Sequence, residues 1–420
     1  MKRPPTPVLG ALASLVLLSG CSSEGAADGP PTVDVWLMRD SLSDSLVARF
    51  QEEFERDNPD ILLDIQIQEW DGIGQRITAA LAGNDAPDVI ETGNSQVAQY
   101  AASGGLVDLS DRVDDLGGDD WLPGLAEPGV HDGLQYGIPF YAANRVVIYN
   151  KDLWEDAGLT GPPRDRAEWL EFSALLDEGG DGAHQGIYLP GQNWYAFAGF
   201  LWDEGGDFAV QGADGAWTGT LDTPEAAAAM EFYAELQSHG EGPKDSDEAQ
   251  PPQIEIMAGG DVAQIIAAPG SAAGIVEANP DLADRLGFFP VPGPTGAALG
   301  SVFVGGSDLV IPAASQDQDA AYEVVRALTG ERWQTEIALE MNYAPNRISL
   351  AEVLEGQEGA YAMARAAAEN GRATPNSPEW AAVEASNVIK EFQTAVLTGE
   401  DPAAAGARAS ESITSTLNAG

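Results

Sequence analysis

The chain is organised around the segment Tyr136-Gly-Ile-Pro-Phe-Tyr-Ala-Ala-Asn-Arg-Val-Val-Ile-Tyr-Asn-Lys151. Pro139 pushes the residue before it into an extended conformation, and Val146 to Tyr149 are β-branched or aromatic, as in a buried strand. Asn144 and Arg145 place two polar side chains between these apolar, extended halves. We interpret the segment as a chain that leaves one folded unit, crosses a wet cleft and enters a second unit.

The N-terminus predicts export. Lys2 and Arg3 give a positive start, Val8 to Leu18 is a short apolar run, and the small residues Ser19-Gly20 follow. This order is typical of a secretory signal peptide, here residues 1–20, and the apolar run is too short to span a membrane.

The residues around the expected cleavage point predict a lipid anchor. Leu18-Ser19-Gly20-Cys21 resembles a lipobox, in which the cysteine becomes the lipidated first residue of the mature protein. Cys21 is the one cysteine of the chain, so it cannot form an internal disulfide. The alternative is an unmodified thiol. We expect lipidation, with residues 21–31 as a flexible tether to the extracellular face of the cell membrane.

Length and charge narrow the class of protein. A mature chain of about 400 residues exceeds what one core usually organises, so two domains are expected. The chain has 67 acidic residues against 20 Lys plus Arg, a formal net charge of −47. Such a charge repels phosphate backbones, which excludes nucleic acid as a partner. Because the charge is spread out and 44% of the residues are hydrophobic, we expect a folded monomer with an acidic surface.

Apolar patterning predicts an α/β fold. Three strands, Val33 to Leu37, Ile61 to Ile67 and Asp88 to Ile90, alternate with helices, which indicates parallel βαβ units. Further strands are predicted at Val262 to Ala267 and Phe288 to Val291. The glycine- and aromatic-rich residues 177–220 fit neither periodicity.

Catalytic and metal-binding signatures are missing from the sequence. It contains no phosphate-binding Gly-Lys loop and no Gly-x-Ser-x-Gly nucleophile motif. His131, His184 and His239 are too far apart for a zinc-type spacing. Asp177 to Tyr188 resembles a calcium loop but loses two ligand positions, including the final glutamate. We therefore predict a protein that is not an enzyme and has no metal and no cofactor.

Aromatic residues in predicted loops suggest a binding site instead. They are Trp70, Tyr141, Trp194, Tyr195, Trp202 and Trp380. One interpretation is that each packs in the core. The other is that several line a groove for a sugar, which presents an apolar C–H face to a ring and hydroxyls to planar polar side chains. Asn193 directly precedes Trp194-Tyr195 and supplies both kinds of group together.

Polar residues also follow two of the predicted parallel strands. Arg39-Asp40 comes after the first strand and Asn94-Ser95-Gln96 after the third. Open α/β sheets bind ligands at the carboxyl ends of such strands. For Arg39 and Asp40, an ordinary surface ion pair between the two is the alternative.

A set of short motifs runs along almost the whole mature chain in a fixed order: Ala86-Pro87-Asp88-Val89, Gly105-Leu106-Val107-Asp108-Leu109, Tyr136-Gly137-Ile138-Pro139, Ile148 to Leu153, Ala157-Gly158-Leu159, Pro162-Pro163, Phe289-Pro290-Val291-Pro292-Gly293, Gly305-Gly306, Trp380 and Leu397-Thr398-Gly399. With the lipobox, this order resembles the extracellular solute-binding proteins of bacterial ABC importers, in particular the carbohydrate-binding group that includes maltose-binding protein.

The resemblance implies two hinged lobes, each a mostly parallel sheet flanked by helices, with three crossings between them. The crossings would lie near 142–145, 288–291 and 341–347. The N-terminal lobe would then comprise 32–143 and 292–341, and the C-terminal lobe 144–291 and 342–420.

The resemblance also implies ligand contacts from both lobes. By position these are Arg39, Asp40, Asn94, Gln96, Asn193, Trp194 and Tyr195, to which we add Trp70 and two residues facing the cleft at the hinge, Tyr141 and Asn144. Gly270 belongs to the predicted site through a departure: many relatives have a tryptophan after Gly-Pro, where this chain reads Ala268-Pro269-Gly270-Ser271. The sugar preference of maltose-binding protein is therefore not carried over.

The function implied is a lipid-anchored receptor that captures a sugar, in our interpretation an oligosaccharide, and delivers it to the permease of an ABC transporter. One alternative keeps the transport role with a polyamine, peptide or glycerol-phosphate ester as ligand. The other is a secreted glycoside hydrolase, which would need two carboxylates flanking the sugar.

Overall fold

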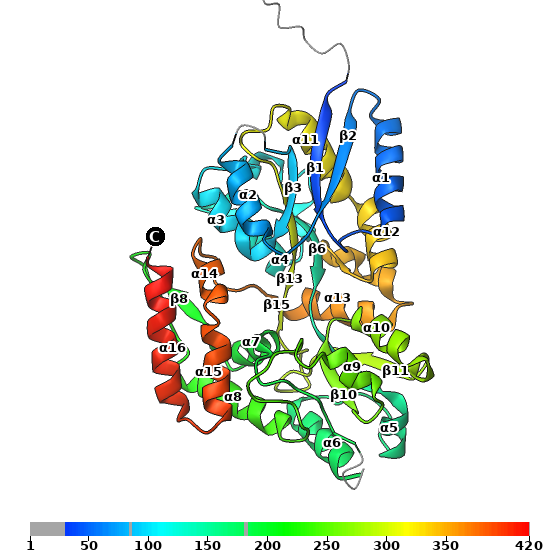
Figure 1. Cartoon of the computed structure of the whole chain (residues 1–420), viewed down its shortest axis with the longest axis vertical. Coiled ribbons are helices and arrows are strands. Elements are labelled where there is room, and N and C mark those ends of the chain that lie inside the picture. The colour runs from blue at the N-terminus through cyan, green and yellow to red at the C-terminus, as the bar shows by residue number, and fades with distance from the viewer. Residues whose placement is uncertain (1–29, 84–85, 180–183, 420) are drawn as a thin grey trace, which may run out of the picture.

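The computed structural model describes residues 30–83, 86–179 and 184–419. The predicted signal peptide, Cys21 and nearly all of the tether lie outside the described residues, as does part of the calcium-like loop. Figure 1 shows two α/β lobes, one above the other, joined by strands that run between them. Within the described ranges no helix has the length and apolar character that crossing a membrane requires.

A six-stranded sheet forms the first lobe, in the order β14-β6-β13-β3-β1-β2. The strands are β1 (Thr32–Met38), β2 (Leu62–Gln68), β3 (Val89–Gly93), β6 (Ile138–Ala143), β13 (Gly305–Val310) and β14 (Ala344–Pro345). β1 pairs in parallel with β2 and with β3, which confirms the predicted βαβ units. β13 is antiparallel to both β3 and β6, so the sheet is mixed.

Helices cover both faces of this sheet (Figure 1). They are α1 (Asp44–Asp57), α2 (Ile73–Leu81), α3 (Val97–Ala102), α4 (Pro123–Ala126), α11 (Gln318–Leu328) and α12 (Glu331–Met341). α1 begins where the Ser43 hydroxyl accepts a hydrogen bond from the Leu46 amide. Its buried Phe50 meets Trp333 of α12 edge to face, with ring centroids 5.1 Å apart.

A three-stranded sheet, in the order β10-β7-β11, lies in the second lobe. The strands are β7 (Val146–Asn150), β10 (Gln264–Ala267) and β11 (Leu286–Phe289). Both outer strands run antiparallel to β7, so the prediction of a mostly parallel sheet is wrong for this lobe. A run of apolar residues indicates that a strand is buried on both faces. Whether that strand pairs in parallel or antiparallel depends on how the chain connects the strands, and the run holds no information on this.

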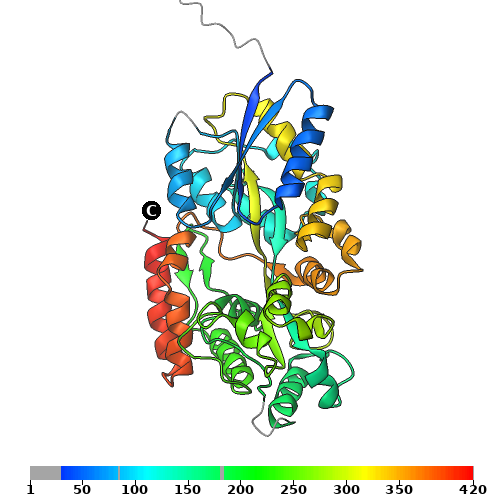
Figure 2. The same ribbon diagram turned by 45° about the vertical axis from the view of Figure 1, so that its right-hand side comes forward.

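Ten helices described by the structure surround this sheet or lie beside it: α5 (Lys151–Asp156), α6 (Arg166–Gly179), α7 (Trp194–Asp203), α8 (Pro224–Gln237), α9 (Gln253–Ala258), α10 (Ser271–Ala278), α13 (Glu358–Asn370), α14 (Trp380–Ala385), α15 (Val388–Leu397) and α16 (Pro402–Leu417). The short strands are β4 (Val130–His131), β5 (Leu134–Gln135), β8 (Ala209–Gln211), β9 (Trp217–Gly219), β12 (Val302–Phe303) and β15 (Gly371–Arg372). Figures 1 and 2 show α15 and α16 side by side along one flank.

The chain passes from one sheet to the other between Ala143 and Val146. β6 ends at Ala143 in the six-stranded sheet, and β7 begins at Val146 in the three-stranded sheet. Asn144 and Arg145 are therefore the two residues that connect strands of different lobes.

The structure differs from the predicted lobe boundaries at 292 and 342. Val302 packs in the core of the second lobe, and the Ser301 amide donates to the Asp203 carboxylate at 2.9 Å, so the chain stays there until β13. β14 pairs with β6 and therefore keeps residues 344–345 in the first sheet. The predicted starts of new lobes at 292 and 342 are thus corrected, because hydrogen-bond partners and not motif order decide where short segments belong. The remaining boundaries stay predictions.

Candidate ligand-binding site

A cavity of about 300 Å³ lies between the lobes. The first lobe contributes Trp70, Gly93, Asn94, Ser95, Tyr141, Ala143, Gly305, Gly306, Ser307 and Tyr343. The other lobe contributes Tyr195 of α7, Phe303 of β12 and Glu384 of α14. A ligand in this cavity would therefore contact both lobes.

Two stacked tyrosines form one wall of the cavity. The rings of Tyr141 and Tyr343 are 4.4 Å apart at their centroids and within 12° of parallel. The Tyr141 hydroxyl lies 2.9 Å from the Ser41 hydroxyl and donates to the Glu91 carboxylate at 3.2 Å. Burial raises the pKa of Tyr141 well above its ordinary value, so its phenol stays neutral. This network fixes the orientation of the ring.

Glu91 is the centre of that network. Its side chain is fully buried and accepts hydrogen bonds from the Met38 amide at 2.8 Å and from the Ser41 hydroxyl at 2.6 Å. Burial raises the pKa of Glu91, and the hydrogen bonds oppose that shift. Glu91 thus connects the end of β1 to the aromatic wall without lining the cavity.

Tyr195 dominates the opposite wall. It stacks on Trp194 with centroids 4.4 Å apart, and the Arg145 guanidinium carbon lies 3.7 Å from its ring centroid. Arg145 is also paired with Glu248 at 2.5 Å. The cation at the first crossing therefore holds an aromatic ring of the second lobe in place, with a cation–π contact as the attractive term.

Glu384 is the charged side chain among the residues lining the cavity. One of its carboxylate oxygens accepts a hydrogen bond from the Trp380 indole nitrogen at 2.6 Å. Burial raises the pKa of Glu384 to about 7, against a smaller lowering by that hydrogen bond. Near neutral pH the cavity therefore holds a carboxyl group that is only partly ionised.

Four of the residues predicted from the sequence meet in this cavity: Trp70, Asn94, Tyr141 and Tyr195. Trp70 is 43% exposed, so its ring is free to contact a ligand. Asn94 donates to the Val304 carbonyl at 3.0 Å and is otherwise almost buried.

Three other predicted residues lie at the surface near the first lobe. Arg39 pairs with Glu69 at 3.3 Å and not with Asp40. Asp40 occupies a turn at φ 67°, where its carbonyl accepts from the Tyr343 hydroxyl at 2.9 Å. Gln96 accepts from the Tyr100 hydroxyl at 3.2 Å and lines a separate surface groove.

The remaining predicted residues serve packing or lie elsewhere. Asn144 is fully buried and donates to the Met363 carbonyl at 3.2 Å. Asn193 caps α7 by accepting from the Ala196 amide, and Trp194 is 7% exposed within the core. Gly270 is exposed immediately before α10. None of these four lines the cavity, and their roles as ligand contacts stay predictions.

Sequence reasoning missed Phe303, Tyr343 and Glu384. Phe303 lies in β12, Glu384 lies in α14 and Tyr343 directly precedes β14. These short elements have neighbours from far away in the chain, so no local pattern marks the three residues. Gly305-Gly306 did carry a signal, because a side chain at Gly306 would meet the Tyr141 carbonyl and its φ is 157°. A glycine pair beside an aromatic in a predicted strand indicates such a close approach.

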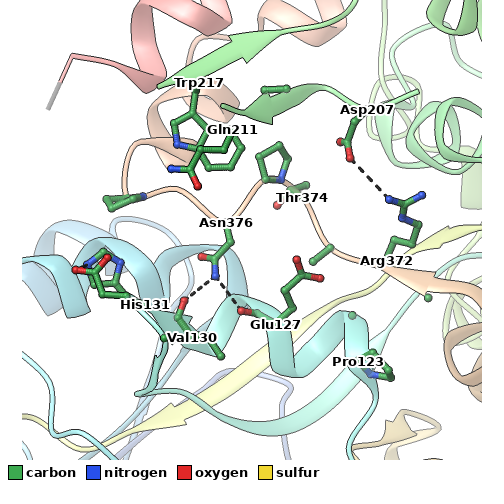
Figure 3. A pocket seen from close by; sticks show the side chains of 18 residues that line it. Pro123, Glu127, Val130, His131, Asp207, Gln211, Trp217, Arg372, Thr374 and Asn376 are labelled. Atoms are coloured by element: carbon green, nitrogen blue, oxygen red, sulfur yellow. Dashed lines mark hydrogen bonds and ion pairs between the residues drawn. The ribbon is translucent and has the colours of Figure 1, made fainter. Parts of the chain in front are cut away.

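Figure 3 shows a second, larger interlobe cavity of about 720 Å³, which contains none of the predicted site residues. Asn376 donates to the carbonyls of Glu127 at 2.9 Å and Val130 at 2.6 Å, and Arg372 lies 3.8 Å from Asp207. β12 pairs with β15, so Phe303 lines the first cavity while its partner Arg372 lines the second. This strand pair separates the two cavities.

The two lobes, the crossings and an aromatic cavity between them define a hinged solute-binding protein. A profile of the family described as bacterial extracellular solute-binding protein matches residues 39–335. The chain therefore belongs to this family, which is non-enzymatic, and the prediction that it is not an enzyme is confirmed.

Individual relatives agree with this class. The diacetylchitobiose binding protein DasA of Streptomyces coelicolor is 38% identical over 413 residues, 96% of each chain. The sugar-binding protein MalE of Xanthomonas citri has the same fold, with a TM-score of 0.83 at 24% identity over 92% of this chain and 97% of that one. The GacH receptor of Streptomyces glaucescens, solved with and without acarbose, gives a TM-score of 0.74 at 26% identity, covering 92% and 98%.

Proposed function

We propose that this protein captures diacetylchitobiose, or a closely similar short oligosaccharide of N-acetylglucosamine, and delivers it to an ABC permease. The relative of that specificity is 38% identical across 96% of both chains, which supports a shared ligand class. The observation that carries the proposal is the interlobe cavity with aromatic side chains on both walls.

The size of the cavity favours a short sugar. Ligand sites of about 300 to 1,000 Å³ hold small molecules, and this one, at about 300 Å³, is at the lower limit. A mono- or disaccharide suits that volume better than a long chain. The rings of Phe303 and Trp70 offer flat apolar faces to the C–H faces of sugar rings.

Closure would follow from contacts in both lobes. A ligand that touches Tyr141 on one wall and Tyr195 on the other interacts more strongly with the closed arrangement than with an open one. No covalent bond is formed or broken in this process, because ligand binding alone shifts the equilibrium between the open and closed states.

Anchoring and delivery complete the proposal. A lipid on Cys21 and a tether over residues 21–31 would keep a monomeric receptor at the extracellular face of the membrane, close to its permease. Mass spectrometry of the mature N-terminus tests the anchor: an unmodified Cys21 in protein isolated from membranes would exclude it.

Calorimetry with diacetylchitobiose, maltose and mannitol tests the ligand class. Trp70→Ala should weaken diacetylchitobiose binding by at least about fivefold, since ring stacking on a ligand is worth about 1 kcal/mol or more. Leu62→Ala is the matched control, because Leu62 is an exposed apolar side chain of the same lobe that does not line the cavity. Absence of diacetylchitobiose binding by the unaltered protein, or unchanged affinity in Trp70→Ala, would refute the proposal.

A further inference from the structure

The carboxyl group of Glu384 lies where a ligand would meet it. Glu384 belongs to α14, lines the 300 Å³ cavity together with Tyr195 and Asn94, and is one helical turn from Trp380. The Trp380 indole occupies one carboxylate oxygen. Across the part of the chain that the structure describes, no hydrogen bond from protein reaches the other oxygen and no salt bridge involves Glu384.

Two cations in the neighbourhood of this carboxyl group are already paired with acids. Arg145, which lies over Tyr195, is paired with Glu248 at 2.5 Å. Lys390 of α15, which lines a small side cavity together with Glu384, is paired with Asp247 at 2.8 Å. Each cation thus has an acid of its own.

The remaining neighbours add no positive charge. Helix α14 also packs against α16 and the single turn η1 (Asn94–Gln96), whose residues are uncharged. On α16, Arg408 is paired with Glu400, and Glu411 is an exposed acid. Among the described residues of these neighbouring elements, no cation is therefore left to compensate the negative charge of ionised Glu384.

We propose that Glu384 gives this site a preference for a cationic amino sugar, so that the protein also binds the free-amine form of its disaccharide, di-glucosamine, through an ammonium–carboxylate contact. This inference rests on the proposed function for the class of sugar but adds a second ligand and the residue that selects it. An ammonium group donates charge-assisted hydrogen bonds to a carboxylate, which are about twice as strong as neutral ones.

The acetylated sugar would use the site differently. Its amide N–H is a neutral donor. The side-chain oxygen of Glu384 in either protonation state, or of a glutamine in its place, can accept a hydrogen bond from it. Replacing Glu384 by glutamine keeps the shape and the acceptor for Trp380 but removes the charge. Glu384→Gln should therefore lower the affinity for di-glucosamine at least about tenfold more than the affinity for diacetylchitobiose.

The experiment is calorimetric titration of the mature protein with di-glucosamine and with diacetylchitobiose at pH 7. Three proteins are compared: the unaltered chain, Glu384→Gln, and Glu379→Gln. Glu379 is the matched control because its replacement removes the same charge five residues earlier in the chain, at the N-cap of α14, and it does not line the cavity. Circular dichroism confirms that each variant is folded, so that a loss of binding is not a loss of structure.

The ratio of the two affinities decides the outcome. The inference holds if this ratio falls at least about tenfold in Glu384→Gln and stays within about threefold in Glu379→Gln. It is overturned if the unaltered protein binds diacetylchitobiose but not di-glucosamine, or if the ratio is the same in Glu384→Gln. Glu384-dependent binding of di-glucosamine without binding of diacetylchitobiose would refute the proposed function and leave this inference standing.

Discussion

Replacing Glu384 by glutamine should change the pH dependence of stability in a way that can be worked out from its environment. Burial raises the pKa of Glu384 from its ordinary value of 4.5 to about 7, so the folded protein holds this proton more tightly than the unfolded chain does. Stability then falls as pH rises from about 4.5 to about 7, and the loss is complete above that window. Glutamine has no proton to lose and is free of this effect.

The size of the effect follows from the same values. One pKa unit corresponds to about 1.4 kcal/mol, so the free energy of unfolding of the unaltered protein should drop, relative to Glu384→Gln, by about 3 kcal/mol between pH 4 and pH 8. Urea unfolding of both proteins at pH 4, 5, 6, 7 and 8 measures this difference directly, because the contributions of all other groups cancel.

The control for this experiment is again Glu379→Gln, which removes a carboxylate from the start of the same helix but not from the cavity. A difference between the unaltered protein and Glu384→Gln that stays constant from pH 4 to pH 8 would refute the reasoning. It would mean that the carboxyl group of Glu384 is solvated well enough to have an ordinary pKa, and that its burial at the cavity adds no free-energy cost to its ionisation.

Three further changes test other parts of the structure. Tyr141→Phe should lower the free energy of unfolding by about 1 to 3 kcal/mol in urea titrations, because buried Glu91 loses a hydrogen-bond donor; an unchanged free energy would argue against the network. Asn193→Ala should cost about 1 kcal/mol by removing the cap of α7, and the same stability in both proteins would contradict the capping role. Asp308 is fully buried, its carboxylate oxygens have no hydrogen-bond partner among the described residues, and burial raises its pKa well above its ordinary value. Asp308→Asn should therefore stabilise the protein more at pH 8 than at pH 4. An equal change in the free energy of unfolding at both pH values would count against this account.

The parts of the fold that sequence predicted are those with a regular apolar period. β1, β2 and β3 alternate or run apolar between amphipathic helices, and the structure pairs them in parallel as expected. Helix α7 escaped prediction because it is apolar on nearly every side, so no periodicity distinguishes it from a loop or a strand. Its cap, Asn193, was instead interpreted as a ligand contact.

Part of the candidate site was predictable because an aromatic or amide side chain lies close to a strand end. Trp70 and Tyr141 satisfy this condition and line the cavity. Tyr343 and Glu384 come from the last quarter of the chain. Contacts between segments far apart in the sequence, such as the pairing of β14 with β6, bring such late segments to the cavity. Local patterns hold no information on such pairings, which is why the second half of the site was missed.

The strand pair β12–β15 lies between the two interlobe cavities, and each strand contributes residues to one of them. A rotation of one lobe against the other would change the volume of both cavities, and with it the amount of water that they hold. At about 30 Å³ for each water molecule, the larger cavity corresponds to roughly two dozen. Ligand affinity would then depend on the activity of water as well as on contacts with the sugar. Adding a neutral osmolyte should therefore change the measured affinity.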